Sequence, residues 1–390
     1  MTSENHALVF GATGLLGWGV LSQLLSGYPH KGTFSSVTAV LRRRMTVEEL
    51  GLASASQPVT LVDDIDLLAG DVEEKLGGVA GVEGTTHVFY FVFAPLDGEE
   101  HREVQVNADM MRRVVEALNL VAPRMRSFVY GGGTKQYGIY TPGGTWSAPL
   151  HESLAEDEQS KLVQSCVYPL QRQILSEACK DRSWSWTELC PDAVIGFSPV
   201  GSAYSLALHW AQYLSLYGRK NGRGHRVVFP GCVRGYDSSF TPVSTRTLGR
   251  VAIYVGLLHL GVDGGGVNGK VINVADREEP ITFRQLWPEI AAWFRLVGVG
   301  PESSPSETQM KPGEYVHLHR ALFADGGRPR AVGCGVGAGR RQLDEVGWWL
   351  TFDRYMSLER LRGVGFREER EPVDGWVEAF ERMREAGIIF

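Results

Sequence analysis

Apolar residues along the chain fall into two recurring patterns, short continuous runs and helical repeats. Residues 7–10, 37–41 and 86–94 are nearly unbroken apolar runs of strand length, and the last shows none of the alternation of a half-exposed strand. Apolar residues recur at helical spacing over 15–25, 107–120 and 167–180. Strands that alternate with helices in this way predict an α/β fold with a doubly wound parallel sheet.

The second half of the chain has a different pattern, in which helices predominate. Helical spacing predicts helices over 203–217, 246–261 and 282–298. Residues 227–231 are expected to form a turn, the Gly- and Arg-rich 326–341 a loop, and 271–275 a late strand that returns to the main sheet. We therefore expect a Rossmann domain over 1–199 that includes the returning strand, and a smaller, mainly helical substrate part over 200–390.

Composition and charge narrow the class of protein. The 390 residues are 43% hydrophobic and 22% charged, which is typical of a soluble globular protein. The net charge of −6 argues against a nucleic-acid partner. The longest apolar run, 251–260, is too short to span a membrane, and the first residues lack the basic region of a signal peptide. Five cysteines without a Cys-x-x-Cys pair indicate reduced thiols and no metal site, so we expect a cytoplasmic protein.

A glycine-rich turn joins the first predicted strand to the first predicted helix. Gly11, Gly14 and Gly17 have the spacing at which a tight turn, a close backbone approach to a ligand and a close helix-to-strand contact are needed. The free N–H groups and positive dipole end of the helix then face a negative ligand. The motif therefore predicts a dinucleotide site, although an ordinary glycine turn can have the same spacing.

Three arginines follow the second predicted strand, at the place where a dinucleotide site binds the adenosine ribose. An acidic residue there accepts hydrogen bonds from a 2′-hydroxyl, whereas the planar guanidinium groups of Arg42 and Arg43 suit a 2′-phosphate. The sequence therefore predicts NADP(H) rather than NAD(H). The alternative is that Arg42, Arg43 and Arg44 form a solvated surface run.

Asp71 leaves two interpretations open. It follows an apolar run at a place where a side chain commonly meets an adenine amino group, and it equally suits the N-cap of the helix expected after it.

Several blocks of sequence together resemble one known family. The blocks include Gly11-Ala-Thr-Gly-Leu-Leu-Gly17, Val40-Leu-Arg-Arg43, Thr134-Lys-Gln-Tyr-Gly138, Pro191-Asp-Ala-Val-Ile-Gly-Phe-Ser-Pro199 and Val346-Gly-Trp-Trp349. They are similar to extended short-chain dehydrogenases of the progesterone 5β-reductase and iridoid synthase type, and to their fungal relatives, over nearly the whole chain. The resemblance implies a Rossmann fold and NADPH as hydride donor to the C=C bond of an enone or to a related carbonyl compound.

The resemblance also implies a catalytic pair. Tyr168 matches the catalytic tyrosine and Lys135 its partner lysine, whereas ordinary short-chain dehydrogenases place the lysine four residues after the tyrosine, where this chain has Arg172. A phenol can donate to the oxygen on which charge develops when hydride adds to an enone, and a nearby ammonium group favours that charge. Taken alone, Tyr168 is better explained as an aromatic residue at a helix start, beside Pro169.

The remaining site residues follow from the motifs and from the same resemblance, in which Pro191, Val194 and Ile195 match the segment that lies along the nicotinamide. We expect cofactor contacts from Gly11, Thr13, Gly14, Leu15, Leu16, Gly17, Arg42, Arg43, Asp71, Val72, Phe93, Ala94, Pro191, Val194 and Ile195. We expect a substrate pocket lined by Tyr137, Tyr140, Trp146, Phe197, Tyr204, Phe352 and Met356. For each pocket residue the alternative is plain core packing.

Three positions depart from the family pattern. Cys190 stands where an arginine usually precedes Pro-Asp, residues 131–133 are all glycine where the loop usually reads Gln-Thr-Gly, and Gln171-Arg-Gln173 replaces an acidic pair. When a buried arginine is lost, its carboxylate partner normally changes too.

We therefore expect an NADPH-dependent reductase of an enone, ketone or aldehyde in specialised-metabolite biosynthesis, acting on a small apolar molecule. One alternative keeps the cofactor but uses the pocket for a non-redox cyclisation or isomerisation. Another is a dinucleotide-sensing regulator without catalysis, against which Tyr168 and Lys135 argue. The sequence is compatible with a homodimer.

Overall fold

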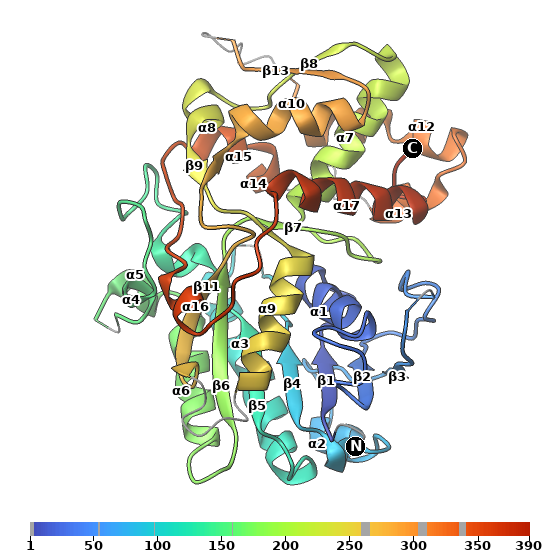
Figure 1. The fold of residues 1–390 in the computed structure, drawn as a ribbon. Coiled ribbons are helices and arrows are strands. Elements are labelled where there is room, and N and C mark those ends of the chain that lie inside the picture. The colour runs from blue at the N-terminus through green and yellow to red at the C-terminus, as the bar shows by residue number, and fades with distance from the viewer. Residues whose placement is uncertain are drawn as a thin grey trace.

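A parallel β-sheet forms the centre of the lower half of the molecule in Figure 1. The computed structural model describes residues 4–53, 55–96, 98–157, 159–258, 266–302, 310–334 and 341–390. Within these residues, seven parallel strands make the sheet, in the order β11-β6-β5-β4-β1-β2-β3. They are β1 His6–Phe10, β2 Ser36–Val40, β3 Thr60–Val62, β4 His87–Tyr90, β5 Ser127–Gly131, β6 Ser185–Pro191 and β11 Lys270–Val274. The α/β fold with a doubly wound parallel sheet is confirmed.

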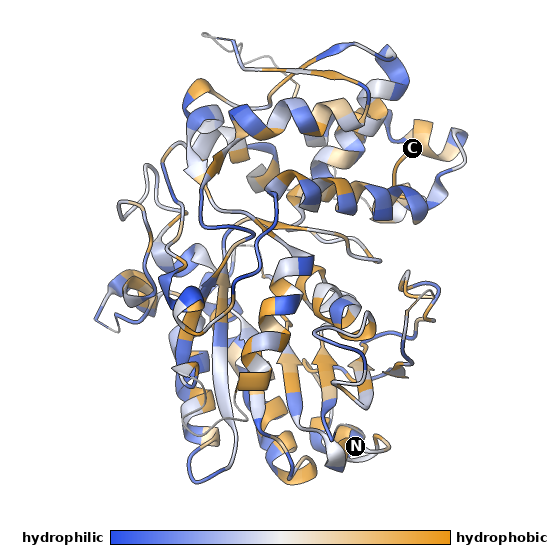
Figure 2. Ribbon diagram, in the orientation of Figure 1, coloured by the Kyte–Doolittle hydropathy of each residue, from blue (hydrophilic) through white to orange (hydrophobic). Residues whose placement is uncertain are grey.

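Both faces of the sheet are covered by helices, which explains why its strands are continuously apolar. On β1, Ala7 and Val9 point into one core, and Leu8 and Phe10 into the other. Figure 2 shows hydrophobic residues gathered on β1, β2 and β4. The first core includes α1 and α9, and the second α2, α3 and α6. These helices are α1 Leu15–Leu25, α2 Val72–Gly77, α3 Glu100–Val121, α6 Tyr168–Ala178 and α9 Thr245–Leu258.

Helices α1 and α9 approach each other closely because glycines face one another between them. A Cβ added at Gly249 would lie 2.7 Å from the Gly19 carbonyl oxygen, and one added at Gly19 would lie 2.6 Å from the Thr245 carbonyl oxygen. Close backbone contact leaves no room for a side chain at either position. A helix from the second half of the chain is thereby fixed against the helix that begins at the glycine turn.

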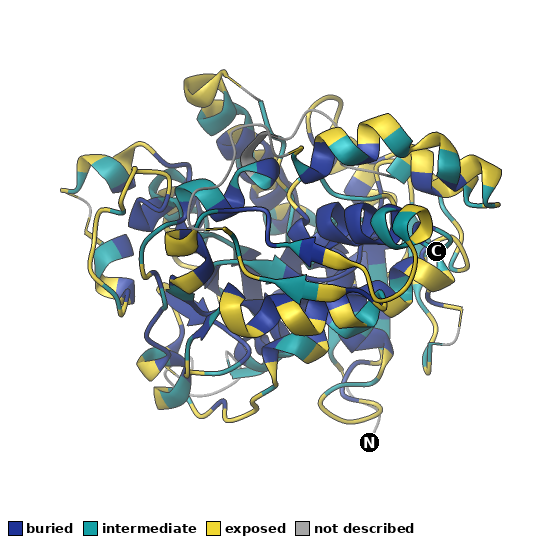
Figure 3. Cartoon of the chain, turned by 90° about the horizontal axis from the view of Figure 1, so that it is seen from above, coloured by how far each residue is buried: buried dark blue, intermediate teal, exposed yellow. Residues whose placement is uncertain are grey.

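The upper half is built mainly from helices around an aromatic core. Trp210 is completely buried, stacks on Trp376 with ring centroids 5.4 Å apart, and meets the edges of Trp287 and Phe229. In Figure 3 the helices carry exposed residues on one side and buried residues on the other. The helices outside the sheet layers are α4 Glu152–Ala155, α5 Lys161–Gln164, α7 Leu206–Asn221, α8 Val233–Asp237, α10 Phe283–Trp293, α11 Pro312–His319, α12 Ala321–Asp325, α13 Pro329–Cys334, α14 Arg341–Asp344, α15 Val346–Trp349, α16 Glu359–Gly363 and α17 Pro372–Glu385.

Short two-stranded sheets connect the segments of this upper half. Strand β7 pairs with β10 and β8 with β13 in parallel, and β9 pairs with β12 antiparallel. Their bounds are β7 Val194–Ile195, β8 Arg226–Val228, β9 Ser239–Phe240, β10 Val243–Ser244, β12 Ile281–Thr282 and β13 Val297–Val299. Two 3-10 helices, η1 Val82–Gly84 and η2 Thr134–Tyr137, complete the elements. No helix of the described residues is long and apolar enough to cross a bilayer.

Several of the predicted elements differ from the structure in type or length. The strand expected over 86–94 ends at Tyr90 in β4. The expected turn over 227–231 begins with a strand, β8, because its backbone pairs with β13. The helix expected over 282–298 ends at Trp293, and the chain then forms β13. Helix α13 lies within the expected loop over 326–341, of which 335–340 fall outside the described residues.

Candidate active site

The turn from β1 into α1 leaves the start of the helix open for an anion. Gly11 has a φ of 78°, and its carbonyl accepts a hydrogen bond from the Gly14 N–H at 2.8 Å. A Cβ added at Gly17 would lie 2.2 Å from the Gly11 oxygen, so only glycine fits there. In the described structure no side chain caps the helix at Gly14, and its first turn carries no acidic residue. Free N–H groups at an uncapped helix start are suited to a phosphate.

The residues between these glycines connect the turn to its surroundings. The Thr13 carbonyl accepts a hydrogen bond from the Ser198 hydroxyl at 2.9 Å, which fixes the turn to the segment after β7. Leu15 is buried, and Leu16 packs beside Gly131 at the end of β5, where an added Cβ would lie 3.4 Å from its side chain. The turn therefore lies at the carboxyl edge of the sheet, where ligands of such folds bind.

The arginines beyond β2 are exposed. Arg44 lies 3.8 Å from Asp63 in an exposed ion pair. Arg42 and Arg43 form no ion pair with any residue that the structure describes. Their guanidinium groups are thus available to a ligand, and the solvated alternative stays open as well.

Asp71 caps α2, since its carboxylate accepts a hydrogen bond from the Glu74 N–H at 2.9 Å. The capping interpretation is confirmed, and a contact with adenine stays a prediction. Val72, the next residue, is buried in the core that includes α2, α3 and α6.

The segment after β4 is held by a buried amide. Asn107 on α3 accepts a hydrogen bond from the Ala94 N–H and donates one to the Ala94 carbonyl, both at 2.8 Å. Phe93 is 44% exposed and meets the equally exposed Tyr204 edge to face, with ring centroids 6.4 Å apart. The structure thereby brings together a predicted cofactor residue and a predicted pocket residue.

The segment expected along the nicotinamide follows the end of β6. Pro191 is the last residue of β6 and pairs with Val274 of β11. Val194 and Ile195 form β7 and pair with β10. Ile195 is buried, whereas Val194 is only partly buried.

Tyr168 lies on α6 and Lys135 on η2, two segments that are joined by the hydrogen bond from Arg172 to Gln136. Tyr168 begins α6, and its hydroxyl oxygen would lie 3.0 Å from a Cβ added at Gly133. Burial raises the pKa of Tyr168 well above its usual value, and Cys166 raises it further. The hydroxyl therefore keeps its proton at neutral pH, as an unperturbed phenol also does.

Lys135 lies on η2, directly after the glycine loop. Its ammonium nitrogen is 3.7 Å from the Glu103 carboxylate of α3, which also accepts a hydrogen bond from the Leu96 N–H at 3.0 Å. Burial raises the pKa of the Cys166 thiol, and the positive charge of Lys135 opposes this rise. The charge of Lys135 therefore acts on Cys166, which lies two residues before Tyr168.

Arg172, one helical turn after Tyr168, does not take the place of the lysine. Its guanidinium donates to the Glu188 carboxylate at 2.8 Å, to the Ala155 carbonyl at 2.8 Å and to the Gln136 side chain. Glu188 is completely buried in the middle of β6. Glu188, the charged partner of α6, thus lies two residues before Cys190. The Cys190 thiol accepts a hydrogen bond from the Gln136 amide at 3.6 Å.

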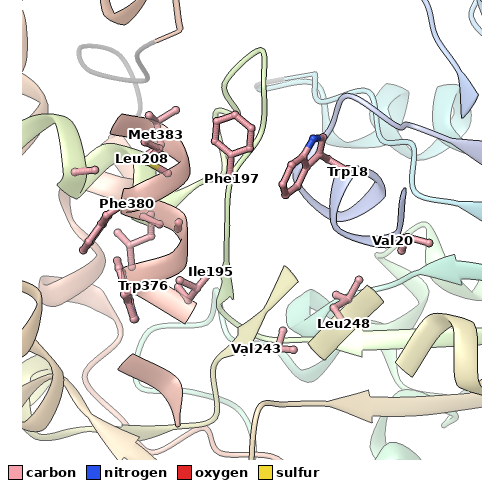
Figure 4. Close-up of a cluster of buried hydrophobic side chains, with 14 of the residues drawn as sticks. Trp18, Val20, Ile195, Phe197, Leu208, Val243, Leu248, Trp376, Phe380 and Met383 are labelled. Atoms are coloured by element: carbon pink, nitrogen blue, oxygen red, sulfur yellow. The ribbon is translucent and has the colours of Figure 1, made fainter. Parts of the chain in front are cut away.

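The predicted pocket residues divide into a packed group and an exposed group. Tyr137 is buried with its hydroxyl donating to Asn273 at 2.7 Å, and Met356 is buried beside it. Phe197 packs against Trp18 with ring centroids 4.9 Å apart (Figure 4). For these three residues the structure favours core packing.

The second group is exposed or partly buried, and its members Tyr140 and Trp146 follow η2 in the chain. Tyr140 is 46% exposed and stacks on Trp349, with ring centroids 5.3 Å apart. Phe352 lies against Gly144, where an added Cβ would be 2.6 Å from its ring. Trp146 is partly exposed as well, as Tyr204 is. These four aromatic residues remain candidates for contact with an apolar ligand.

Sequence reasoning missed the buried charges around this site. Glu188 stands between Trp186 and Leu189 in a predicted strand, and a buried carboxylate in a strand must be paired, so the signal was there. Asp192 accepts a hydrogen bond from Thr134 at 3.0 Å and lies 3.1 Å from Arg354. Arg354 is 2% exposed and lies over the Phe240 ring at 4.6 Å. The pairing of Arg354 with Asp192 joins distant parts of the chain, so no local sequence pattern predicts it.

Known proteins match the chain over nearly its whole length. The profile of the PRISE-like Rossmann-fold domain matches residues 7–390. The short chain dehydrogenase sirS of Leptosphaeria maculans is 31% identical over 417 residues, which cover 98% of this chain and 97% of that protein. The 3-oxo-Delta(4,5)-steroid 5-beta-reductase of Arabidopsis thaliana is 27% identical over 394 residues, which cover 98% and 93%.

Solved structures of reductases share the fold. Vestitone reductase from alfalfa superposes with a TM-score of 0.56 at 16% identity, covering 98% of this chain and 99% of the other. Yeast methylglyoxal/isovaleraldehyde reductase Gre2 complexed with NADPH gives a TM-score of 0.58 at 11% identity, covering 98% and 100%. At these identities the likeness concerns the fold alone.

Proposed function

Because the chain belongs to the PRISE-like Rossmann-fold domain family, we propose that it is an NADPH-dependent reductase of an enone C=C bond, a ketone or an aldehyde. The observation that carries the proposal is the partly buried Tyr168, whose hydroxyl lies beside Gly133, on the sheet edge that also carries the open start of α1. The homologues and structural neighbours are short-chain dehydrogenases and reductases. We further propose that residues 1–199 together with β11 bind the cofactor and that the rest of 200–390 binds the substrate. The reaction would belong to specialised-metabolite biosynthesis.

The residues after β1 and β2 fit a phosphorylated dinucleotide. The N–H groups at the start of α1 would hold the pyrophosphate, because no side chain of the described residues occupies them. Arg42 and Arg43 would bind the 2′-phosphate through charge-assisted hydrogen bonds. The exposed state of both arginines supports this assignment, since neither is committed to another described group.

The chemistry follows from the charge that the reaction creates. When bound, NADPH supplies a hydride to the electrophilic carbon of the substrate. Negative charge then develops on the carbonyl oxygen, and Tyr168 would donate its proton there. Because burial raises the pKa of Tyr168, this transfer needs a positive charge close to the phenol. The Lys135 ammonium lowers the cost of the negative charge left on the tyrosine oxygen.

The experiment is a turnover assay with a panel of cyclic and open-chain enones, ketones and aldehydes. The purified chain is mixed with NADPH and each compound, and the loss of the reduced nicotinamide absorbance is followed together with product formation. The proposal predicts equal molar loss of NADPH and gain of reduced product. Product formed without loss of NADPH would instead favour the non-redox cyclase or isomerase.

A further inference from the structure

Glu188 is a buried and extensively hydrogen-bonded side chain near the candidate catalytic pair. Its side chain is 0% exposed, and its two carboxylate oxygens accept from the Tyr130 hydroxyl at 2.6 Å, the Gln136 amide at 2.7 Å and the Arg172 guanidinium at 2.8 Å. A buried carboxylate is tolerated only when its partners satisfy it in this way. Every one of these donors comes from a different structural element.

Two of those elements carry the candidate catalytic residues. Gln136 follows Lys135 directly on η2, and Arg172 lies one turn after Tyr168 on α6, on the same side of the helix. Gln136 and Arg172 are also hydrogen-bonded to one another. Glu188 therefore links the segment that carries the lysine to the helix that carries the tyrosine.

The glycine loop between these segments is shaped by the same carboxylate. A Cβ added at Gly132 would lie 2.2 Å from Glu188 Oε1, and one added at Gly133 would lie 3.0 Å from the Tyr168 hydroxyl oxygen. Neither glycine has a φ in the left-handed region, and Gly133 is extended with a φ of 170°, so the absence of a side chain serves space rather than backbone conformation. The loop can pass over the site because Gly132 and Gly133 have no side chains, since Glu188 and Tyr168 occupy the space that side chains would need.

Glu188 also neutralises the cation that lies four residues after Tyr168 on α6. Arg172 is 12% exposed and directs its donors to Glu188, Gln136 and the Ala155 carbonyl. The ionisable groups that act most strongly on the Tyr168 hydroxyl are Cys166, Cys190, Glu188 and Tyr140. Lys135 acts on the thiol of Cys166.

We propose that Glu188 is a positioning residue, which holds Lys135 and Tyr168 in a fixed relation through Gln136 and Arg172 and keeps the charge of Arg172 away from the Tyr168 hydroxyl. The role of the pair in turnover rests on the proposed function. The charge at Tyr168 does not, because the titration of Tyr168 can be measured without a substrate.

The test replaces Glu188 by glutamine and measures the ionisation of Tyr168 directly. Protein labelled with ¹³C at the tyrosine ζ-carbon is titrated by NMR to the highest pH at which the fold persists, and the pH at which the Tyr168 signal begins to shift is compared between the proteins. The Tyr168 signal is assigned from its loss in Tyr168→Phe. In Glu188→Gln the negative charge is gone and Arg172 is unpaired, so the pKa of Tyr168 falls and its ionisation constant rises by about tenfold or more. With an active substrate, kcat falls by about tenfold to a hundredfold, because the reacting groups are displaced. The Kd for NADPH changes by less than about threefold, since the glycine turn is untouched.

Two further variants separate charge from placement. Glu188→Asp keeps the charge but is one methylene shorter, so the Tyr168 titration returns towards that of the wild type while kcat stays reduced. Glu152→Gln removes another buried carboxylate, which accepts from the Asn273 N–H at 3.0 Å, and changes neither measurement. If Glu188→Gln does not fold, Glu188→Asp alone still decides the question through kcat.

The proposal is overturned if the Tyr168 signal titrates in Glu188→Gln as in the wild type, or if kcat of Glu188→Asp equals that of the wild type. A wild-type chain that binds no NADPH would refute the proposed function. The NMR titration would still test Glu188 in that case.

Discussion

Replacing Gly17 by alanine tests the glycine turn at its tightest contact. The added Cβ would lie 2.2 Å from the Gly11 carbonyl oxygen and 2.6 Å from the Gly11 carbonyl carbon, both of which are backbone atoms that no rotamer change can move. Since non-bonded heavy atoms pack at roughly 3.5 Å, the start of α1 must move by about 1 Å relative to the turn. Overpacking of this kind costs about 1–3 kcal/mol in the free energy of unfolding.

The same displacement acts on cofactor binding. The N–H groups of the first turn of α1 would be out of place by about 1 Å, an error that can cost about a hundredfold. We therefore expect the Kd for NADPH to rise by about a hundredfold, measured by quenching of tryptophan fluorescence, while urea unfolding gives the loss of stability. Gly363→Ala is the matched control, because an added Cβ there meets nothing within 4 Å among the described residues. The reasoning fails if Gly17→Ala binds NADPH as tightly as Gly363→Ala and unfolds at the same urea concentration.

Three further predictions concern the proton donor, the choice of cofactor and a buried acid. Tyr168→Phe lowers kcat by about two to four orders of magnitude with little change in the Kd for NADPH; unchanged turnover would remove Tyr168 from the mechanism. The double variant Arg42→Ala/Arg43→Ala weakens NADPH binding by about a hundredfold and leaves NADH binding unchanged, as calorimetry can check, whereas equal losses for both cofactors would contradict the assignment.

Asp276 is buried, and its burial raises its pKa to about 6, although hydrogen bonds from Ser244 oppose the rise. Its ionised form is thus disfavoured in the folded state, so its contribution to stability is lost as the pH rises from about 4 to about 6. Relative to Asp276→Asn, the wild type should lose about 3 kcal/mol of unfolding free energy over that range. Parallel pH dependences of the two proteins in urea unfolding would show that Asp276 has no such shift.

The elements around the glycine turn could be predicted because their signals are local. The apolar run of β1, the helical spacing of α1 and the three glycines between them lie within twenty-five residues of one another. The resemblance to the progesterone 5β-reductase and iridoid synthase type, carried by several such blocks, is confirmed by the family match over residues 7–390.

Elements that depend on distant partners could not be predicted in the same way. Strand β8 forms because its backbone pairs with β13, and residues 226–228 alone do not specify that partner. The pairs Glu188 with Arg172 and Asp192 with Arg354 likewise depend on which segments the fold brings together. Sequence showed that Cys190 and the glycines at 131–133 depart from the family pattern, and the structure adds that the carboxylate of Glu188 occupies the space above Gly132.

The central claim is tested most directly by following the hydride itself. NADPH that carries deuterium at the reactive position of its nicotinamide is incubated with the wild-type chain and the panel of enones, ketones and aldehydes, and the products are analysed by mass spectrometry and NMR. The account predicts one deuterium per product molecule, at the β-carbon of a reduced enone or at the carbinol carbon of a reduced carbonyl, and at least a hundredfold less label with Tyr168→Phe. Products that form without deuterium, or a panel in which no compound gains it, would contradict the account.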